Sequence, residues 1–158
     1  MNDPPWLTEP SLAVARWILA SYRSAYGRPL VAGSAAGAHP RQAAQELFAA
    51  DRAVLAHDGA ADPQLIYANA AALQLWRRTW NEMVGLPSRQ TAEPQERQAR
   101  AQALATAQAQ EAVTGYGGIR VDNAGRRFRI EGARLWTLRD GEGQPRGQAA
   151  TFSHWWWL

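Results

Sequence analysis

The sequence predicts an α+β fold, with a single antiparallel sheet of about five strands, helices packed on one side of it, and a further N-terminal helix. Three observations support this prediction. Upstream of residue 50, apolar residues recur at intervals of three and four, which is typical of helices. From Tyr116 to Phe152, apolar and polar residues alternate between polar turns, which is typical of strands. Between these regions, two short apolar runs lead into a further helical pattern.

The N-terminal region predicts a helix, a linker and a second short helix. The first helix begins near Pro10 and ends at Gly27, which is followed by Arg28 and Pro29. Residues 31–39 are small and form the predicted linker, and a short helix follows over about residues 40–50. We therefore divide the chain into an N-terminal extension, residues 1–46, and a domain over residues 47–158.

The middle of the chain predicts two strands and two helices. Residues 53–57 and 64–68 form short apolar runs separated by the turn signal Asp58-Gly59. Asn69 is placed to cap a helix that continues to Gly85, with one apolar stripe formed by Leu73, Trp76, Trp80 and Met83. A second helix over residues 94–113 is rich in alanine and glutamine, so its predicted buried face is thin. Residues 115–118 are expected to end it.

The C-terminal third predicts three strands joined by the turns Asp122-Asn-Ala-Gly and Asp140-Gly-Glu-Gly. On the middle strand, four apolar residues occupy even positions, and period-two spacing predicts that all four point to one face: Phe128, Ile130, Trp136 and Leu138. The chain ends in three tryptophans and Leu158, which cannot all face inward on a strand. We expect either the N-terminal helix or a second copy of the chain to cover them.

Composition indicates one domain of 158 residues with no cysteine, which excludes disulfides and thiol chemistry. All 17 basic residues are arginine, and the region from Tyr116 onward holds seven of them against four acidic residues. This excess equals the net charge of +3, and it indicates either a solvated sheet face or a surface for an anion or nucleic acid. No signal peptide or membrane-spanning segment is visible, so we expect a cytoplasmic protein.

No catalytic or metal-binding motif is present in the sequence. The histidines at 39, 57 and 154 lack metal-ligand spacing, and no phosphate-binding loop, dinucleotide fingerprint or nucleophile motif occurs. We therefore predict that the protein is not an enzyme and binds no metal. The best polar candidates for ligand contact are Arg120, Arg127, Arg129 and Glu131, with cross-strand pairing as the alternative. Trp76, Trp80 and Trp136 line a ligand pocket or simply form core.

The order of elements resembles the PAS domain family, and four strings in order carry the resemblance: residues 67–71 (Tyr-Ala-Asn-Ala-Ala), 81–87 (Asn-Glu-Met-Val-Gly-Leu-Pro), 122–126 (Asp-Asn-Ala-Gly-Arg) and 139–143 (Arg-Asp-Gly-Glu-Gly). From about residue 47 to 154 the chain is more similar to the PAS-related MEKHLA domain, in its bacterial stand-alone form. The strings that indicate this are residues 87–94 (Pro-Ser-Arg-Gln-Thr-Ala-Glu-Pro), 118–120 (Gly-Ile-Arg), 127–131 (Arg-Phe-Arg-Ile-Glu) and 147–152 (Gly-Gln-Ala-Ala-Thr-Phe).

The resemblance implies a sensory or regulatory module without catalysis that binds a small molecule or a protein and often forms a homodimer. The candidate ligand contacts also include Asn69, which lies in the string of residues 67–71. Gln148 is a further candidate, because flavin-sensing relatives place a glutamine on the last strand. Haem is disfavoured, because residues 94–113 contain no histidine to serve as axial ligand. Non-covalent flavin or a small metabolite remains open. The alternatives are an enzyme on a PAS-like scaffold and a nucleic-acid-binding module that uses the arginine-rich sheet.

Overall fold

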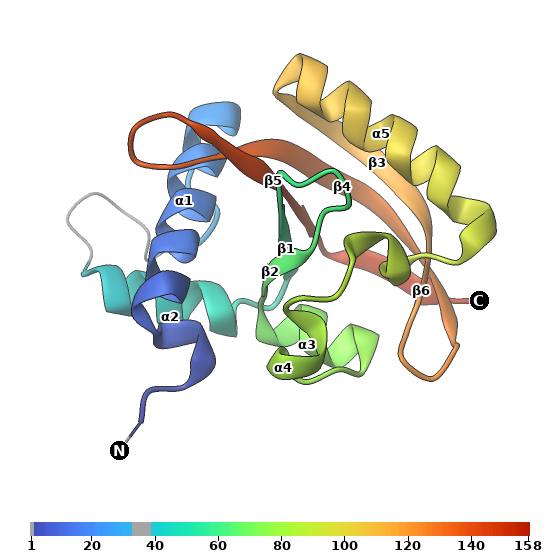
Figure 1. Ribbon diagram of the computed structural model, residues 1–158, viewed down its shortest axis with the longest axis horizontal. Coiled ribbons are helices and arrows are strands. Elements are labelled where there is room, and N and C mark those ends of the chain that lie inside the picture. Colours follow the sequence, from blue (N-terminus) through green and yellow to red (C-terminus); the bar gives the residue numbers. More distant parts are fainter. Residues whose placement is uncertain (1, 33–38) are drawn as a thin grey trace.

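A computed structural model describes residues 2–32 and 39–158, and Figure 1 shows the arrangement of its elements. In chain order these are α1 (Glu9–Tyr26), α2 (Pro40–Ala49), β1 (Ala53–Asp58), β2 (Leu65–Ala68), α3 (Ala70–Trp76), α4 (Trp80–Met83), α5 (Arg97–Gln110), β3 (Ala112–Val121), β4 (Arg127–Arg139), β5 (Pro145–Phe152) and β6 (His154–Trp157). Of the predicted linker, residues 33–38 lie outside the described residues.

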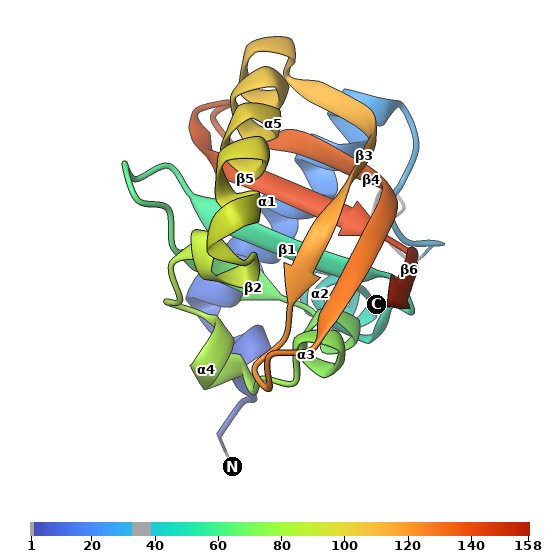
Figure 2. The ribbon, with the colours of Figure 1, turned by 90° about the vertical axis from the view of Figure 1, so that its right-hand side faces the viewer.

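The strands form one antiparallel sheet in the order β2-β1-β5-β4-β3. The β6 strand continues the line of β5 and pairs with the first part of β4, from Phe128 to Glu131. Figure 2 shows α5 lying in front of this sheet and α1 behind it. The predicted α+β class with one antiparallel sheet is confirmed, and the N-terminal helix is present as α1.

The face of the sheet opposite α5 packs against α1. Together they form a closed apolar layer, called the α1 layer below. Ile18 and Tyr22 of α1 are almost fully buried against Trp136 of β4. The Trp136 indole nitrogen donates a hydrogen bond to the Ser21 hydroxyl at 3.0 Å. Aromatic rings at edge-on angles, such as Tyr22 and Trp136 with centroids 5.0 Å apart, fill the remaining space. This layer fixes α1 to the sheet, whereas the predicted boundary at residue 46 stays a prediction.

The apolar residues of β4 do not share one face, so that prediction is wrong. Phe128 and Ile130 lie in the core on the α3 and α5 side, while Trp136 and Leu138 lie in the α1 layer. Gly132 between them has φ of 67°, and the pairing with β3 shifts by one residue at this point. Such a bulge reverses the alternation of side chains, and glycine adopts this conformation without strain.

The helix predicted from Asn69 to Gly85 is two helices, α3 and α4. Arg77 adopts a left-handed conformation with φ of 57° and ends α3. Thr79 then starts α4 through a capping box in which its hydroxyl accepts from the Glu82 N–H, and the Glu82 carboxylate accepts from the Thr79 N–H. The break turns Trp80 toward the α1 layer, whereas Trp76 stays on the α5 side.

Residues 115–118 do not separate the long helix from the strands as predicted. The helix ends at Gln110, Glu111 follows with φ of 69°, and β3 begins at Ala112. The glycines therefore lie inside β3, where β4 pairs with them through an irregular register.

The tryptophan tail forms β6 and is not covered by α1, so the first of the two expected covers is wrong, while cover by a second copy stays a prediction. The apolar stripe of α1 is already occupied by the sheet. Trp155 and Trp157 instead pack edge-on against Phe128, with centroids 6.1 and 5.7 Å away. The three tryptophans remain 37–43% exposed, and Arg126 lies over the Trp157 ring at 3.8 Å from its centroid.

No helix in residues 2–32 and 39–158 combines the length and the apolar character needed to cross a membrane.

Candidate functional site

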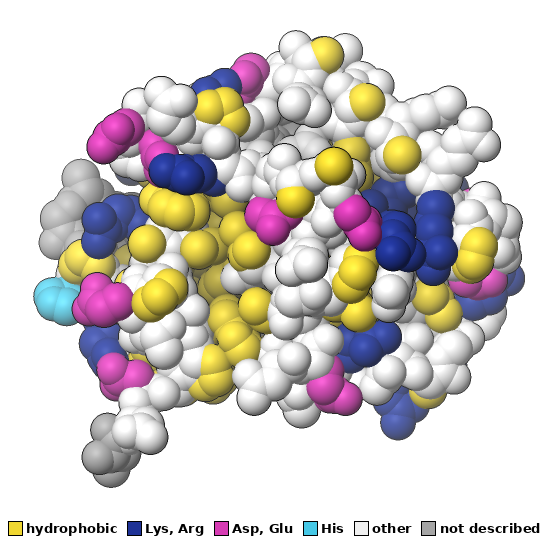
Figure 3. Space-filling view, viewed as in Figure 1, with side chains coloured by type: hydrophobic (Ala, Val, Ile, Leu, Met, Phe, Trp, Pro, Cys, Tyr) yellow, Lys and Arg dark blue, Asp and Glu magenta, His cyan; other side chains and the backbone are white. Residues whose placement is uncertain are grey.

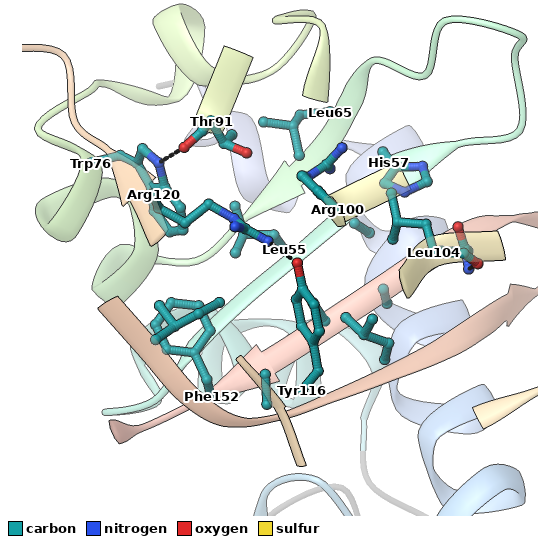
Figure 4. Close-up of a pocket in the computed structure, with 17 residues that line it drawn as sticks. Leu55, His57, Leu65, Trp76, Thr91, Arg100, Leu104, Tyr116, Arg120 and Phe152 are labelled. Carbon is teal, nitrogen blue, oxygen red and sulfur yellow. Dashed lines mark hydrogen bonds between the residues drawn. The ribbon is translucent and has the colours of Figure 1, made fainter. Parts of the chain in front are cut away.

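A small cavity of about 60 Å³ lies between α5 and the front face of the sheet. Residues of α5 form one wall of the cavity, and residues of β1, β3, β4 and β5 form the other. Figure 4 shows the side chains around it. Most of the lining is apolar, and its members include Leu55, Leu65, Trp76, Leu104, Ile130, Leu135 and Phe152.

His57 brings an imidazole into this lining from β1. Its side chain is only 7% exposed, and Nδ1 lies 2.9 Å from the Asp58 carbonyl oxygen, so Nδ1 carries the proton and donates it. The other nitrogen, Nε2, is buried without a hydrogen-bond partner among the described residues. Burial lowers the pKa of His57 below its ordinary value of 6.5, the Asp58 carbonyl opposes this, and the Arg100 charge adds to it. The ring is therefore neutral at pH 7, with a free acceptor.

Arg120 of β3 carries a positive charge into the same space. It is 5% exposed, and one guanidinium nitrogen donates to the Ile119 carbonyl at 2.8 Å while another donates to the Tyr116 hydroxyl. The guanidinium also lies 5.5 Å from the centroid of the Tyr116 ring. All of these partners are neutral, so no carboxylate balances the charge.

Gly118 makes room for the Arg120 guanidinium. The two residues lie two positions apart on β3 and therefore share a face. A Cβ atom added at Gly118 would lie 2.9 Å from a guanidinium nitrogen of Arg120 and 3.4 Å from the Tyr116 hydroxyl. Any larger residue at this position would displace the cation from the cavity wall.

Arg100 of α5 is the second cation. No hydrogen bond or ion pair joins it to another described residue, and in Figure 4 it lies between the His57 ring and the Arg120 side chain. Burial lowers the pKa of Arg100 to about 10, with the Arg120 charge adding to this and the Tyr116 hydroxyl opposing it. At pH 7 the group still carries its full charge. Two guanidinium groups thus face one cavity.

Helix α5 is attached to the sheet by few contacts. Ala107 is its only fully buried residue, as the sequence predicts for a helix with a thin apolar face. The Gln148 side chain on β5 donates a hydrogen bond to the Leu104 carbonyl at 2.8 Å. At the start of the helix, Arg97 donates to the carbonyls of Arg89 and Ala92, both at 3.1 Å. The wall of the cavity that α5 provides is therefore the one that can move most easily.

The structure brings three of the predicted site residues to the cavity: Trp76, Arg120 and Gln148. Trp80 and Trp136 belong to the α1 layer instead. The side chains of Arg127, Arg129 and Glu131 are on the exposed face of β4, and Arg127 pairs with Glu93.

Asn69 is fully buried away from the cavity lining. Its side-chain oxygen accepts from the N–H groups of Val54 and Ala72, and its nitrogen donates to the carbonyls of Leu47 and Arg52. As predicted, it caps the helix that follows β2. In addition it joins that helix to β1.

Sequence reasoning did not select His57, Arg100 or Tyr116. For Arg100 a signal existed, because it shares a helical face with Leu104 and Ala107, the only side of α5 that packs on the sheet. For His57 the signal was its place in an otherwise apolar strand. Tyr116 gave no signal, since it lies among glycines that were expected only to end the preceding helix.

The lining combines positive charge with an apolar body. It includes no aspartate or glutamate among the described residues, and no group of three His, Asp or Glu side chains elsewhere in the described chain is placed to hold a metal ion. Figure 3 shows basic side chains gathered directly below α5 on the outer surface. The site can donate hydrogen bonds to an anion, accept one at His57, and enclose apolar atoms.

Solved structures with a similar fold are PAS and light-oxygen-voltage domains. A PAS domain from Colwellia psychrerythraea matches with a TM-score of 0.62 and 17% identity, over 70% of this chain and 92% of that one. A light-oxygen-voltage domain studied with a flavin analogue matches with a TM-score of 0.57 and 18% identity, over 74% and 84% of the two chains. An RNA-binding light-oxygen-voltage receptor matches with a TM-score of 0.60 and 25% identity, over 79% of this chain and 35% of the receptor.

These likenesses show that the chain has a PAS-like fold. No curated protein sequence matches it. The model of the MEKHLA domain matches residues 12–157 and therefore includes α1 as well as the sheet. Because this match covers nearly the whole chain, the protein belongs to the MEKHLA domain family.

Proposed function

We propose that this protein is a regulatory module that binds a small molecule between α5 and the sheet and does not catalyse a reaction. The observation that carries the proposal is the cavity of about 60 Å³, whose lining holds two guanidinium groups without an acidic partner and one imidazole nitrogen without a hydrogen-bond partner among the described residues. Buried charges in proteins are normally paired, so a cavity with unpaired charges favours a bound ligand.

The cavity fits a small molecule better than a flavin or a haem. Pockets for drug-sized ligands and cofactors measure roughly 300–1,000 Å³, several times this volume. The side chains of Arg100, Leu104 and Tyr116 line the cavity and leave only about 60 Å³ between them and the sheet. We therefore do not assign either cofactor to this site, and we favour the small metabolite that the sequence left open.

Binding would be reported through α5. A ligand that contacts both α5 and the sheet stabilises the arrangement in which the two lie close together, and it shifts the population toward that arrangement. Because α5 has little buried surface of its own, a modest binding energy is sufficient to change how often it separates from the sheet.

The alternatives have weaker support. Three arginines of the C-terminal region form ion pairs at the surface, Arg127 with Glu93, Arg139 with Glu111 and Arg146 with Asp140, which reduces the free positive charge available to nucleic acid. Homodimer formation through α1 and the tail stays a prediction. The described surface leaves Trp155–Trp157 exposed for such a contact but not the apolar stripe of α1.

Native mass spectrometry of the freshly purified protein tests the proposal. We expect a mass increment from a retained small molecule, and we expect Leu104→Trp, which fills the cavity from α5, to abolish it. The control Leu158→Trp adds the same side chain at an exposed position and should retain the increment. If Leu104→Trp retains the molecule as well as the unaltered protein does, the ligand lies elsewhere and the proposal is wrong.

A further inference from the structure

Among the described residues, the arginines that form ion pairs differ in their surroundings from the two arginines that line the cavity. Five arginines form ion pairs with aspartate or glutamate, and most of the side chains in these pairs are well exposed: Arg41, Arg89, Arg127, Arg139 and Arg146. The two that line the cavity, Arg100 and Arg120, have no acidic partner. Ion pairs at the surface contribute little to stability, whereas an unpaired buried charge is costly; of the two, Arg120 is buried and Arg100 is partly exposed. The described lining of the cavity therefore lacks a carboxylate, although a negative charge beside Arg100 and Arg120 would stabilise the fold.

The two cations come from different elements, on opposite walls of the cavity. Arg100 is on α5, and Arg120 is on β3 at the opposite wall. Arg120 is held by Tyr116 and by the space that Gly118 leaves, so its position does not depend on α5. A single anion that contacts both guanidinium groups would therefore join α5 to the sheet.

The remainder of the lining restricts the chemistry of that anion. Its walls are mainly leucine, isoleucine and aromatic side chains, and the cavity volume of about 60 Å³ leaves room for only a few atoms beside a charged group. A planar carboxylate matches the fork of a guanidinium group through two parallel hydrogen bonds. Phosphate sites typically use backbone N–H groups at a helix N-terminus, but Arg100 lies within α5, one turn after its start.

We propose that the ligand is a short aliphatic carboxylate whose charged group bridges Arg100 and Arg120 and whose apolar end lies against Leu55, Leu104 and Phe152. His57 Nε2 accepts a hydrogen bond from any hydroxyl group that the ligand carries near its carboxylate. This inference rests on the proposed function, because it names the ligand class of the same cavity.

Without a bound ligand, the protein should become more stable when one of the two cavity arginines is replaced. Replacing Arg100 by a neutral residue removes a charge that nothing in the cavity balances, so Arg100→Gln should raise the unfolding temperature in buffer without organic anions. An arginine with a purely structural role would give the opposite result. The same substitution should remove the stabilisation that a carboxylate gives to the unaltered protein.

Isothermal titration calorimetry and thermal unfolding with sodium propionate and sodium lactate test the inference. Propionamide serves as the neutral isostere, and inorganic phosphate and sulfate as other anions. We expect at least one carboxylate to bind at least tenfold more tightly than propionamide. We expect Arg100→Gln and Arg120→Gln each to weaken that binding at least tenfold. Arg16→Gln, on the exposed surface of α1, and Arg129→Gln, on the exposed face of β4, remove the same charge and should bind as the unaltered protein does.

Each contrary outcome has a separate meaning. Binding of propionamide with equal affinity, or unchanged binding by both cavity variants, overturns the carboxylate assignment and leaves the ligand-binding function standing. Binding of phosphate or sulfate in preference to the carboxylates does the same. If no probe binds and native mass spectrometry finds no retained molecule, both the inference and the proposed function are wrong. Circular dichroism checks that Arg120→Gln is folded, and Arg100→Gln carries the test if it is not.

Discussion

The two faces of the sheet are packed in different ways, although a helix covers each of them. Behind the sheet, α1 buries Ile18 and Tyr22 against Trp136, and a hydrogen bond from the indole to Ser21 fixes the contact. In front, α5 buries only Ala107 fully, and a cavity remains beneath it. Arg100 and Arg120, which have no acidic partner among the described residues, both lie on the α5 side of the core, whereas Arg134 of β4 donates to the Tyr22 hydroxyl in the α1 layer.

This difference indicates a division of roles between the faces. A filled layer supports the stability of the domain but has few alternative arrangements. A helix over a cavity with unbalanced charge has lower stability, and it responds to whatever balances that charge. The α1 layer includes the N-terminal helix, most of which lies within the residues that match the family. We expect the two faces to differ in stability as their packing indicates.

Truncation of a core side chain should have the largest effect on the α1 face. Trp136→Ala removes a fully buried ring and a hydrogen bond, and we expect it to lower the free energy of unfolding by about 3–5 kcal/mol. Leu104→Ala on α5 removes a partly exposed side chain, and we expect a loss of about 1 kcal/mol. Urea denaturation followed by circular dichroism measures both. Equal losses would show that α5 contributes as much to the core as α1 does.

How far the sequence predicts these two faces depends on the element. The Asn69 cap, the antiparallel strands and the thin face of α5 follow from local patterns, and the structure has all three. The reversal at Gly132 does not follow, because a bulge depends on pairing with a distant strand rather than on local alternation. As a result, Trp136 appeared to share a face with Phe128.

The same limit explains which site residues the sequence indicated. Arg120 and Gln148 belong to family strings and lie at the cavity. Arg127 and Arg129 belong to the same kind of string, but the pleat of β4 points them outward. Arg100 and His57 become neighbours only when α5 crosses the sheet. Sequence spacing cannot show a meeting between residues that are more than forty positions apart.

Amide hydrogen exchange should distinguish the two helices directly. We expect the slowest amides of α5 to exchange at least tenfold faster than those of α1, which corresponds to a difference of about 1.4 kcal/mol in opening free energy. The physical reason is that α5 can separate from the sheet without exposing the α1 layer. Mass spectrometry of peptic fragments gives the rates. Equal protection in both helices would show that the domain opens only as a whole.

His57 should make the stability of the domain depend on pH. Its pKa is lowered in the folded state by burial, so below about pH 6.5 the unfolded chain binds a proton that the folded chain does not. Stability is therefore fully present above this pH and falls as the pH decreases toward the folded pKa, with a slope of up to about 1.4 kcal/mol per pH unit.

Urea denaturation between pH 7.5 and pH 5 measures this slope, and His57→Gln should reduce it. The matched control His154→Gln removes an exposed imidazole and should leave it unchanged. If the two variants show the same pH dependence as each other, the buried ring of His57 is not the source of the effect.

The smallest expected effect comes from the hydrogen bond that attaches α5 to β5. Gln148→Leu keeps a side chain of similar size but removes the donor to the Leu104 carbonyl, with an expected loss of about 0.5–1.5 kcal/mol. Because Gln148 lies on the α5 side of β5, the substitution should lower the free energy of opening of α5. Amide exchange in α1 should stay unchanged. Hydrogen exchange of both helices in Gln148→Leu measures the two quantities in one experiment. A uniform loss of protection in α1 and α5 would mean that the two faces are coupled, and that α5 does not act as a separate element above the cavity.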